Sequence, residues 1–157
     1  FFRLSLGNEV RLKSAYIIKG ESVVKDYAGN ILEIHCTYDP DTRSGSGTEG
    51  SERKVKGTLH WVNAADAVEV EVREYDRLFR VENPASEEGD FKDYINPDSL
   101  EIIKAFVEPS LKNMPQDAYI QFIRKGYYCL DPDASPEKLV FNRTVTLKDT
   151  WAREQNK

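Results

Sequence analysis

The chain has 157 residues and a mass of 18.0 kDa, with 39% hydrophobic, 11% aromatic and 31% charged residues. These values are typical of one globular domain or two small ones, and the aromatic content excludes an intrinsically disordered chain. No apolar run approaches the roughly 18 residues of a membrane-spanning helix. The net charge of −5 is the opposite of what a nucleic-acid-binding protein leads one to expect.

The start of the chain and its cysteines bear on its origin. It begins at Phe1 without a methionine or the pattern of a signal peptide, so we expect a piece of a longer polypeptide. Cys36 and Cys129 have no CxxC partner, which favours a reducing, cytoplasmic compartment and no metal site. We interpret both cysteines as small buried hydrophobic residues.

Alternation with a period of two dominates the chain and predicts an all-β fold. In the first strand, residues 9–13, Val10 and Leu12 point one way. Arg11 and Lys13 then share a solvent-exposed face that could meet an anion. Strands at 21–25 and 31–38, joined by a glycine- and asparagine-containing turn, predict a hairpin.

The middle of the chain alternates between loops and strands. Residues 39–53 lack large apolar side chains and predict a mobile surface loop. Strands are expected at 55–62 and from 68 toward 79. The acidic segment 81–98 is interrupted by proline and glycine and is the best candidate for a boundary between two subdomains.

The last third of the chain predicts shorter elements. Residues 99–107 form a strand, and 109–115 form a turn or a short helix. The aromatic-rich segment 118–130 predicts two strands bent at Gly126, and a final strand covers 138–147.

Motifs for catalysis and metal binding are weak. Gly45, Gly47 and Gly50 match a dinucleotide-binding pattern, but a strand rather than a helix follows them, which favours a flexible loop. His35 and His60 lack ligands at the spacing of a zinc site. Hydrolase, metalloprotease and P-loop signatures are also missing, so we expect no catalytic site in this chain.

Cationic and amide side chains on β-structure are the remaining candidates. A β-barrel that presents such groups can read the edges of unpaired RNA bases, although pattern alone also fits ordinary surface residues. The candidates are Arg3, Arg11, Lys13, Gln121 and Arg124, with the aromatic residues Phe1, Phe2, Tyr119 and Tyr128 near them in sequence.

Several segments resemble, in the same order and across essentially the whole chain, the C-terminal anticodon-binding region of glutaminyl-tRNA synthetases. The ATP-binding signatures of that family are absent. The segments are residues 7–16 (GNEVRLKSAY), 36–39 (CTYD), 54–62 (KVKGTLHWV), 75–79 (YDRLF), 126–131 (GYYCLD) and 141–151 (FNRTVTLKDTW).

The resemblance implies two β-barrel subdomains of the type found in a ribosomal 5S-RNA-binding protein. Residues 1–80 would be the distal barrel, and residues 81–157 most of the proximal barrel, which is incomplete because its first strands precede Phe1 in the family. It also implies that the chain itself is non-catalytic and binds the anticodon loop of glutamine tRNA. The parent enzyme would use ATP and Mg²⁺ in a catalytic domain that is a further partner, with no role for DNA or a membrane.

The resemblance also assigns roles to individual residues. Arg3 matches an arginine that reads the third anticodon base, and Arg11 one near the first base. Lys13 replaces an arginine and keeps its charge without the bidentate fork, which suits a phosphate. Gln121 matches a glutamine that reads the middle base, beside Arg124. Because strict alternation would place these last two on opposite faces, we favour Gln121 as the contact.

Two alternatives remain open. The same architecture occurs in glutamyl-tRNA synthetases of the archaeal or eukaryotic type, although residues 37–42 and 76–79 favour the glutaminyl enzyme. A β-sandwich interaction module without a role in RNA binding, its aromatic residues forming the core, is the alternative from another functional class.

Overall fold

The structure is a computed structural model that describes residues 3–147. Strands and short 3₁₀ helices make up its regular elements, so the all-β prediction is confirmed. No helix among these residues is long and apolar enough to span a membrane. The chain divides into two compact units, Phe1–Trp61 and Val62–Lys157, which are described separately.

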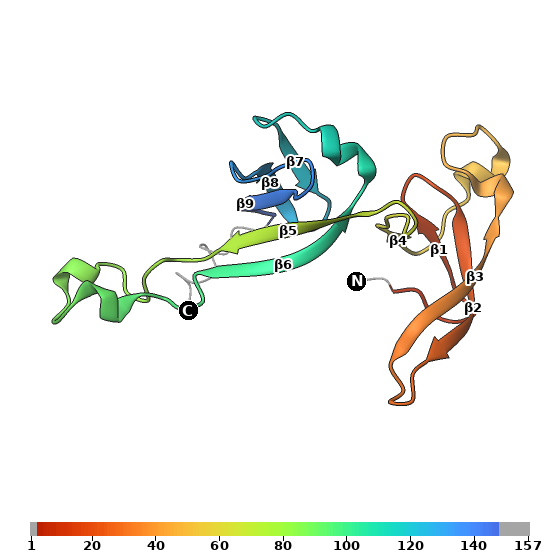
Figure 1. The fold of residues 1–157 in the computed structure, drawn as a ribbon. Coiled ribbons are helices and arrows are strands. Elements are labelled where there is room, and N and C mark those ends of the chain that lie inside the picture. The colour runs from red at the N-terminus through yellow and green to blue at the C-terminus, as the bar shows by residue number, and fades with distance from the viewer. Residues whose placement is uncertain (1–2, 148–157) are drawn as a thin grey trace. The chain divides into compact units, whose positions relative to one another are not determined.

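The first unit contains a four-stranded sheet in the order β3-β2-β1-β4 (Figure 1). Its strands are β1 (Glu9–Leu12), β2 (Ile17–Lys25), β3 (Ile31–Asp39) and β4 (Thr58–Leu59). β2 pairs antiparallel with β1 and β3, and β4 pairs parallel with β1. The hairpin predicted between β2 and β3 is therefore confirmed. In its turn, the Asp26 carboxylate accepts a hydrogen bond from the Asn30 amide at 2.8 Å.

The strand predicted at 55–62 is shortened to β4. Within residues 3–147, its only neighbour in the sheet is the four-residue strand β1. The Arg11 amide donates to the Gly57 carbonyl, and the Lys13 amide donates to the Leu59 carbonyl. This short partner limits the ladder, so alternating side chains alone overestimate the length of the strand.

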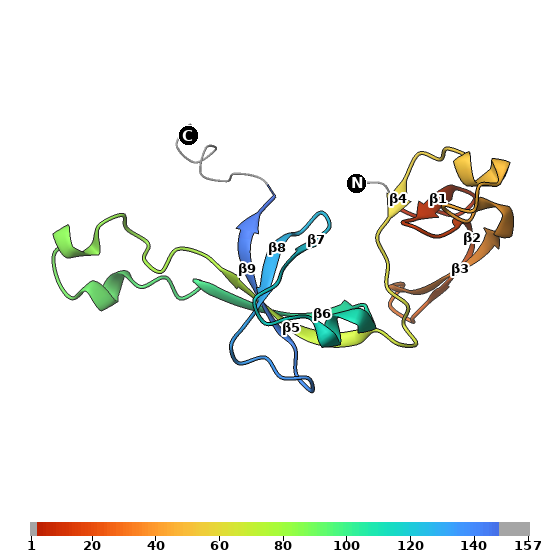
Figure 2. The same ribbon diagram turned by 90° about the horizontal axis from the view of Figure 1, so that it is seen from above.

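The connection from β3 to β4 contains the 3₁₀ helices η1 (Pro40–Thr42) and η2 (Glu49–Glu52). Figure 2 shows the two helices together, close to the end of β3 from which η1 follows. The Asp39 side chain caps η1 by accepting a hydrogen bond from the Asp41 amide at 3.1 Å. Pro40 occupies the first turn, where its missing N–H costs no hydrogen bond.

The second unit contains a five-stranded sheet in the order β6-β5-β9-β8-β7. Neither this sheet nor the first closes into a barrel within the described part of the chain. The strands are β5 (Val68–Tyr75), β6 (Leu100–Val107), β7 (Tyr119–Phe122), β8 (Gly126–Leu130) and β9 (Val140–Thr146). The 3₁₀ helices are η3 (Pro84–Ser86), η4 (Phe91–Tyr94) and η5 (Pro109–Asn113), the last of which matches the predicted turn or short helix.

The core of the second unit lies on one face of its sheet. Alternation in β5 directs Val70 and Val72 to this face, where both are buried. Phe122 packs edge-to-face against Phe141, which is completely buried, with ring centroids 5.4 Å apart. The other buried members of the core are Val107, Tyr128, Leu130 and Leu139.

The division between the units differs from the boundary drawn from the sequence. Contacts divide the chain between Trp61 and Val62, and residues 81–98 connect two strands of one sheet. The reason is the register of β5 and β6, which pair over their whole length from Val68–Val107 to Tyr75–Leu100. The intervening segment extends away from the sheet (Figure 1). It holds six acidic residues and one basic residue, a balance equal to the net charge of the whole chain.

The cysteines differ from the sequence-based interpretation. Both are free. Cys36 is exposed on β3, so the expectation that it is buried is wrong, whereas Cys129 is half-buried. β3 is an edge strand, and most of its residues are exposed whatever their alternation, which explains the difference.

Candidate nucleic-acid interface

Arg3 lies at the beginning of a segment that runs beside β2. Leu6 forms an isolated bridge with Gly20, and the Gly7 amide donates to the Gly20 carbonyl at 2.8 Å. Asn8 closes this segment through a side-chain hydrogen bond to Ser5 at 2.7 Å. The backbone that follows Arg3 is therefore fixed, while the Arg3 side chain is exposed.

Lys13 follows β1 in a tight turn and is also exposed. Two contacts hold its backbone. Its amide donates to the Leu59 carbonyl at 2.9 Å, and its carbonyl accepts a hydrogen bond from the Trp61 indole N–H at 3.0 Å. The next residue, Ser14, has a φ of 59°, which reverses the chain direction. The Lys13 ammonium is thus presented to solvent from a well-fixed backbone.

Arg11 does not share the solvent-exposed face with Lys13, so that prediction is wrong. Its side chain is half-buried, and its guanidinium group donates to main-chain and side-chain oxygens of the β3–β4 connection and of the turn after β1. The acceptors are the carbonyls of Thr42 (2.7 Å), Arg53 (3.0 Å), Ser51 (3.1 Å) and Ala15 (3.4 Å) and the Ser44 hydroxyl (3.2 Å). We call this arrangement the Arg11 cradle.

The connection of residues 40–53 is held by specific contacts, although the sequence predicts a mobile loop. Thr42 is completely buried; its hydroxyl accepts from the Ile17 amide at 2.9 Å and donates to the Asp39 carbonyl at 2.6 Å. At Gly50, a Cβ atom would lie 2.6 Å from the Asp41 carbonyl oxygen, closer than such contacts allow. Gly50 therefore serves close packing of the loop, whereas Gly45 and Gly47 are in open space and each has a φ of 76°.

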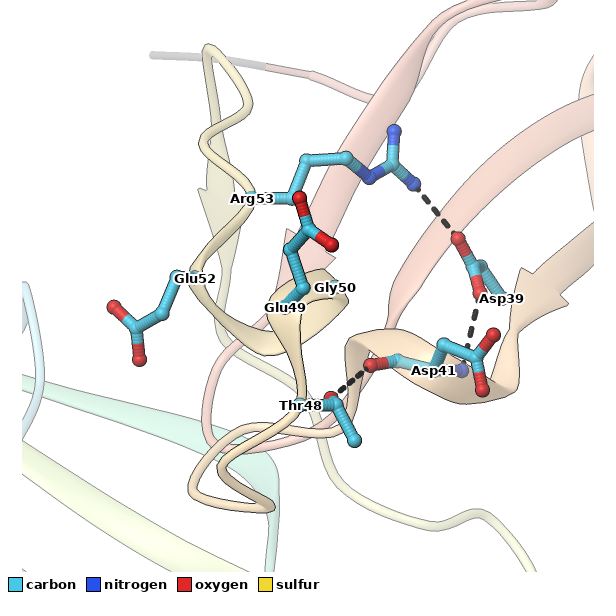
Figure 3. Close-up of a pocket in the computed structure, with 7 residues that line it drawn as sticks. All are labelled: Asp39, Asp41, Thr48, Glu49, Gly50, Glu52 and Arg53. Carbon is cyan, nitrogen blue, oxygen red and sulfur yellow. Dashed lines mark hydrogen bonds and ion pairs between the residues drawn. The ribbon is translucent and has the colours of Figure 1, made fainter.

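Arg53 ties the end of this loop to β1 and β3. It forms a bidentate ion pair with Glu9 at 2.7 and 3.3 Å. Figure 3 shows its further hydrogen bond to Asp39, at 3.1 Å. Its bond to Glu9 raises the pKa of Arg53 above the ordinary value. Arg53 and Asp39 border a pocket of about 620 Å³ that is also lined by Asp41, Glu49 and Glu52. The negative charge of these carboxylates disfavours the binding of a phosphate in this pocket.

Gln121 lies on β7 in the second unit. Its neighbours Ile120 and Phe122 pack against the core, so alternation directs Gln121 to the opposite, outer face, where it is exposed. Tyr119 shares this face with an exposed fraction of 74%. Tyr127 on β8 pairs directly with Gln121 and is 44% exposed. The amide is therefore adjacent to two exposed tyrosines, one along its own strand and one across the hairpin.

Arg124 lies in the turn between β7 and β8, with a φ of 67°, and is exposed. A hydrogen bond of 2.8 Å from the Lys125 amide to the Phe122 carbonyl closes this turn. A Cβ atom at Gly126 would lie 2.7 Å from the Val145 carbonyl oxygen, so only glycine allows β8 to approach β9 here. Because Arg124 belongs to a turn, strand alternation does not set its direction relative to Gln121.

The aromatic residues named from the sequence divide into different classes. Tyr119 is exposed on the outer face, whereas Tyr128 is 2% exposed and belongs to the core. Phe1 and Phe2 lie outside the described residues. Sequence patterns did not indicate Tyr127 and Trp61, because their placement depends on the β7–β8 register and on a contact with a distant turn.

Metal ligation finds no support in the described part of the chain. Within residues 3–147, no three His, Cys, Asp or Glu side chains are grouped as for a metal ion. The structure brings Arg3, Arg11 and Lys13 into the first unit, and Gln121 and Arg124 into one hairpin of the second.

Comparisons with known proteins agree with the sequence resemblance. Two family models, each described as the anticodon-binding domain of class I tRNA synthetases (E and Q), match residues 1–39 and 58–131. Similar curated proteins are glutamine–tRNA ligases. The one from Rhodopirellula baltica is 52% identical over 100% of this chain, that from Vibrio parahaemolyticus 54% over 98%, and that from Escherichia coli 56% over 96%.

The chain spans only about a quarter of the length of these relatives, 26% of the first and 27% of the other two. The two family models match segments in both compact units. Together with the all-β architecture, these matches show that the chain belongs to the family of anticodon-binding domains of class I glutamyl- and glutaminyl-tRNA synthetases.

Proposed function

We propose that this chain binds the anticodon loop of glutamine tRNA as the recognition module of a cytoplasmic glutamine–tRNA ligase. The observation that supports this most strongly is the identity of 52–56% to glutamine–tRNA ligases over nearly the whole chain. The whole protein would join glutamine to its tRNA with ATP and Mg²⁺. The described residues offer no grouped metal ligands, so no step of that chemistry is assigned to them.

Binding would combine phosphate contacts with base recognition. Arg3 and Lys13 present exposed cations from fixed backbone in the first unit, which suits phosphates or a base edge. Gln121 presents an amide with both donors and an acceptor, and Arg124 adds an exposed cation at the turn of the same hairpin. Unpaired anticodon bases expose their Watson–Crick edges to groups of this kind.

Arg11 serves recognition differently in this proposal. Its two terminal nitrogens already donate to the oxygens of the Arg11 cradle, so a direct contact with RNA would use the Nε–H or require one of these oxygens to be released. The cradle contains no carboxylate, so its oxygens solvate the positive charge without neutralising it. Arg11 therefore contributes positive potential near Lys13 while it holds the loop.

The catalytic part of the whole protein would be a further partner of this chain.

The acidic segment 81–98 repels RNA electrostatically, because it concentrates the negative charge of the chain. This property favours a location of the segment away from the tRNA backbone.

Aminoacylation by the whole protein tests this proposal. With a glutamine tRNA transcript, ATP and Mg²⁺, we expect esterification by glutamine and not by glutamate. Esterification by glutamate instead would indicate the glutamyl enzyme, whose anticodon-binding domain shares the matched family models. Failure with both amino acids and no binding of tRNA would favour a module without a role in RNA recognition.

A further inference from the structure

The outer face of the β7–β8 hairpin has an unusual composition for an exposed surface in this acidic chain. Residues 118–130 contain two cations, Arg124 and Lys125, and no carboxylate, although the whole chain has a net charge of −5. Both cations are exposed at the turn. The turn of the hairpin is thus positively charged and suited to a phosphate, whereas the exposed carboxylate of Asp117 lies just before β7.

Two large aromatic side chains remain exposed on this face. The core takes its aromatic residues from the other face, through Phe122 and the buried Tyr128. Tyr119 and Tyr127 are not used in this way and are 74% and 44% exposed. Exposed tyrosines on an edge hairpin add little to the stability of the fold and are a common means of binding flat ligands.

Strand geometry places both rings next to the Gln121 amide. Tyr119 is two residues before Gln121 on the same strand, a separation of about 7 Å along one face. Tyr127 is the direct cross-strand partner of Gln121, with Cβ atoms about 5 Å apart in such pairs. A flat ring that stacks on either tyrosine would present its edge to the amide.

We propose that Tyr119 and Tyr127 form a stacking site for an unpaired nucleobase whose edge is read by Gln121. The inference rests on the proposed function, because it takes anticodon RNA as the ligand. Stacking supplies affinity without regard to base identity, since every base has a π-face. The amide supplies the choice among bases, and the cations at the turn contact the adjacent phosphate.

The test measures binding of a glutamine tRNA transcript to the whole protein carrying Tyr119→Leu, Tyr119→Phe or Tyr127→Leu. The loss of a stacked base predicts a rise in Kd of about 5- to 100-fold for Tyr119→Leu and a similar rise for Tyr127→Leu. Tyr119→Phe keeps the ring and is expected to bind within about 2-fold of the unaltered protein. The matched control is Tyr27→Leu, which removes a fully exposed tyrosine from the β2–β3 turn.

Two further readouts separate stacking on a base from contacts with the phosphate backbone. Because no cation is removed, the salt dependence of binding should keep its slope in Tyr119→Leu. A transcript with an abasic residue at the middle anticodon position should bind more weakly to the unaltered protein and be insensitive to Tyr119→Leu. Equal effects of Tyr119→Leu on the abasic and the complete transcript would overturn the stacking site.

The outcome also distinguishes this inference from the proposed function. If the unaltered protein binds glutamine tRNA and both leucine variants bind equally well, the stacking site is refuted and the proposed function stands. A Tyr119→Phe variant as weak as Tyr119→Leu would also refute stacking, because the ring is intact. If the unaltered protein binds no tRNA, the proposed function itself fails.

Discussion

Replacing Arg11 by methionine should free the β3–β4 connection from its anchor. The change removes three short hydrogen bonds, from the guanidinium group to the carbonyls of Thr42, Ser51 and Arg53 at 2.7 to 3.1 Å. Buried bonds from a charged donor contribute about 1.5–3 kcal/mol each. Arg11 is only half-buried and the freed carbonyls regain water, so we expect about 1 kcal/mol for each bond and about 3 kcal/mol in total.

Hydrogen exchange of backbone amides measures this loss locally, without assuming that both units unfold together. A cost of about 3 kcal/mol corresponds to exchange roughly 100-fold faster. It should appear at Ser44 and Ile17, whose amides donate to Ala15 and to the Thr42 hydroxyl. Amides of β8 in the second unit should keep their rates and serve as an internal reference.

A comparison of lysine and methionine at position 11 distinguishes the loss of the hydrogen bonds in the Arg11 cradle from the loss of the positive charge. Arg11→Lys keeps the charge, but one ammonium cannot span carbonyls on both sides of the cradle. We expect its exchange rates to be close to those of Arg11→Met. Arg43→Met, in the same loop but exposed, should leave the rates unchanged. Full protection in Arg11→Lys, or rates within about 3-fold of the unaltered chain in Arg11→Met, would refute the anchoring role.

Three further changes test other parts of the structure. Gly50→Ala places a Cβ against the Asp41 carbonyl. Unfolding in urea should show that the free energy of unfolding of the first unit falls by about 1–3 kcal/mol. An unchanged midpoint of the urea transition would show that the loop relaxes freely. Thr42→Val leaves the Ile17 amide and the Asp39 carbonyl without their buried partner, so it should lower the free energy of unfolding by about 1–3 kcal/mol. Thr42→Ser keeps the hydroxyl and should retain most of this stability. Equal losses in both variants would point to packing instead of the hydrogen bonds. Burial, with the neighbouring Glu74, raises the pKa of Tyr128 to about 12. Since the folded state then holds this proton more tightly than the unfolded state, stability should be complete below pH 10 and fall between pH 10 and 12; a Tyr128→Phe variant with the same alkaline fall in its urea midpoint would contradict this assignment.

Local patterns were sufficient to predict much of the secondary structure. Alternation in residues 68–73 predicted β5, and the turn between β2 and β3 was correctly located from its glycine and asparagine. These features depend on neighbours in the sequence. The all-β class followed from them, because most periodic segments share the period of a strand.

The features that local patterns missed depend on distant contacts. The loop of residues 40–53 has a mobile composition, yet Arg11 and Arg53 fix it through partners 31 to 44 residues away. The same contacts remove Arg11 from the solvent-exposed face that alternation assigned to it. The β5–β6 pairing likewise makes residues 81–98 a connection within one sheet, although proline, glycine and charge suggested a boundary.

In the candidate site, too, some residues follow from the sequence and others only from distant contacts. Resemblance to a family indicates Gln121, and the structure places it on the face of β7 opposite the core. The two tyrosines next to it become apparent only from the cross-strand register and the exposed fractions. Arg124 could not be placed by alternation, because its left-handed backbone belongs to a turn.

The most direct test of anticodon recognition compares aminoacylation of glutamine tRNA with that of transcripts altered at the middle anticodon base. For the whole protein, Gln121→Ala should lower kcat/KM for the natural transcript by about 5- to 150-fold, as for loss of a base-edge contact of about 1–3 kcal/mol. It should have little further effect on the altered transcripts, which have already lost that contact. An equal loss with every transcript would contradict base recognition by Gln121 and reduce its role to a contact with the RNA backbone.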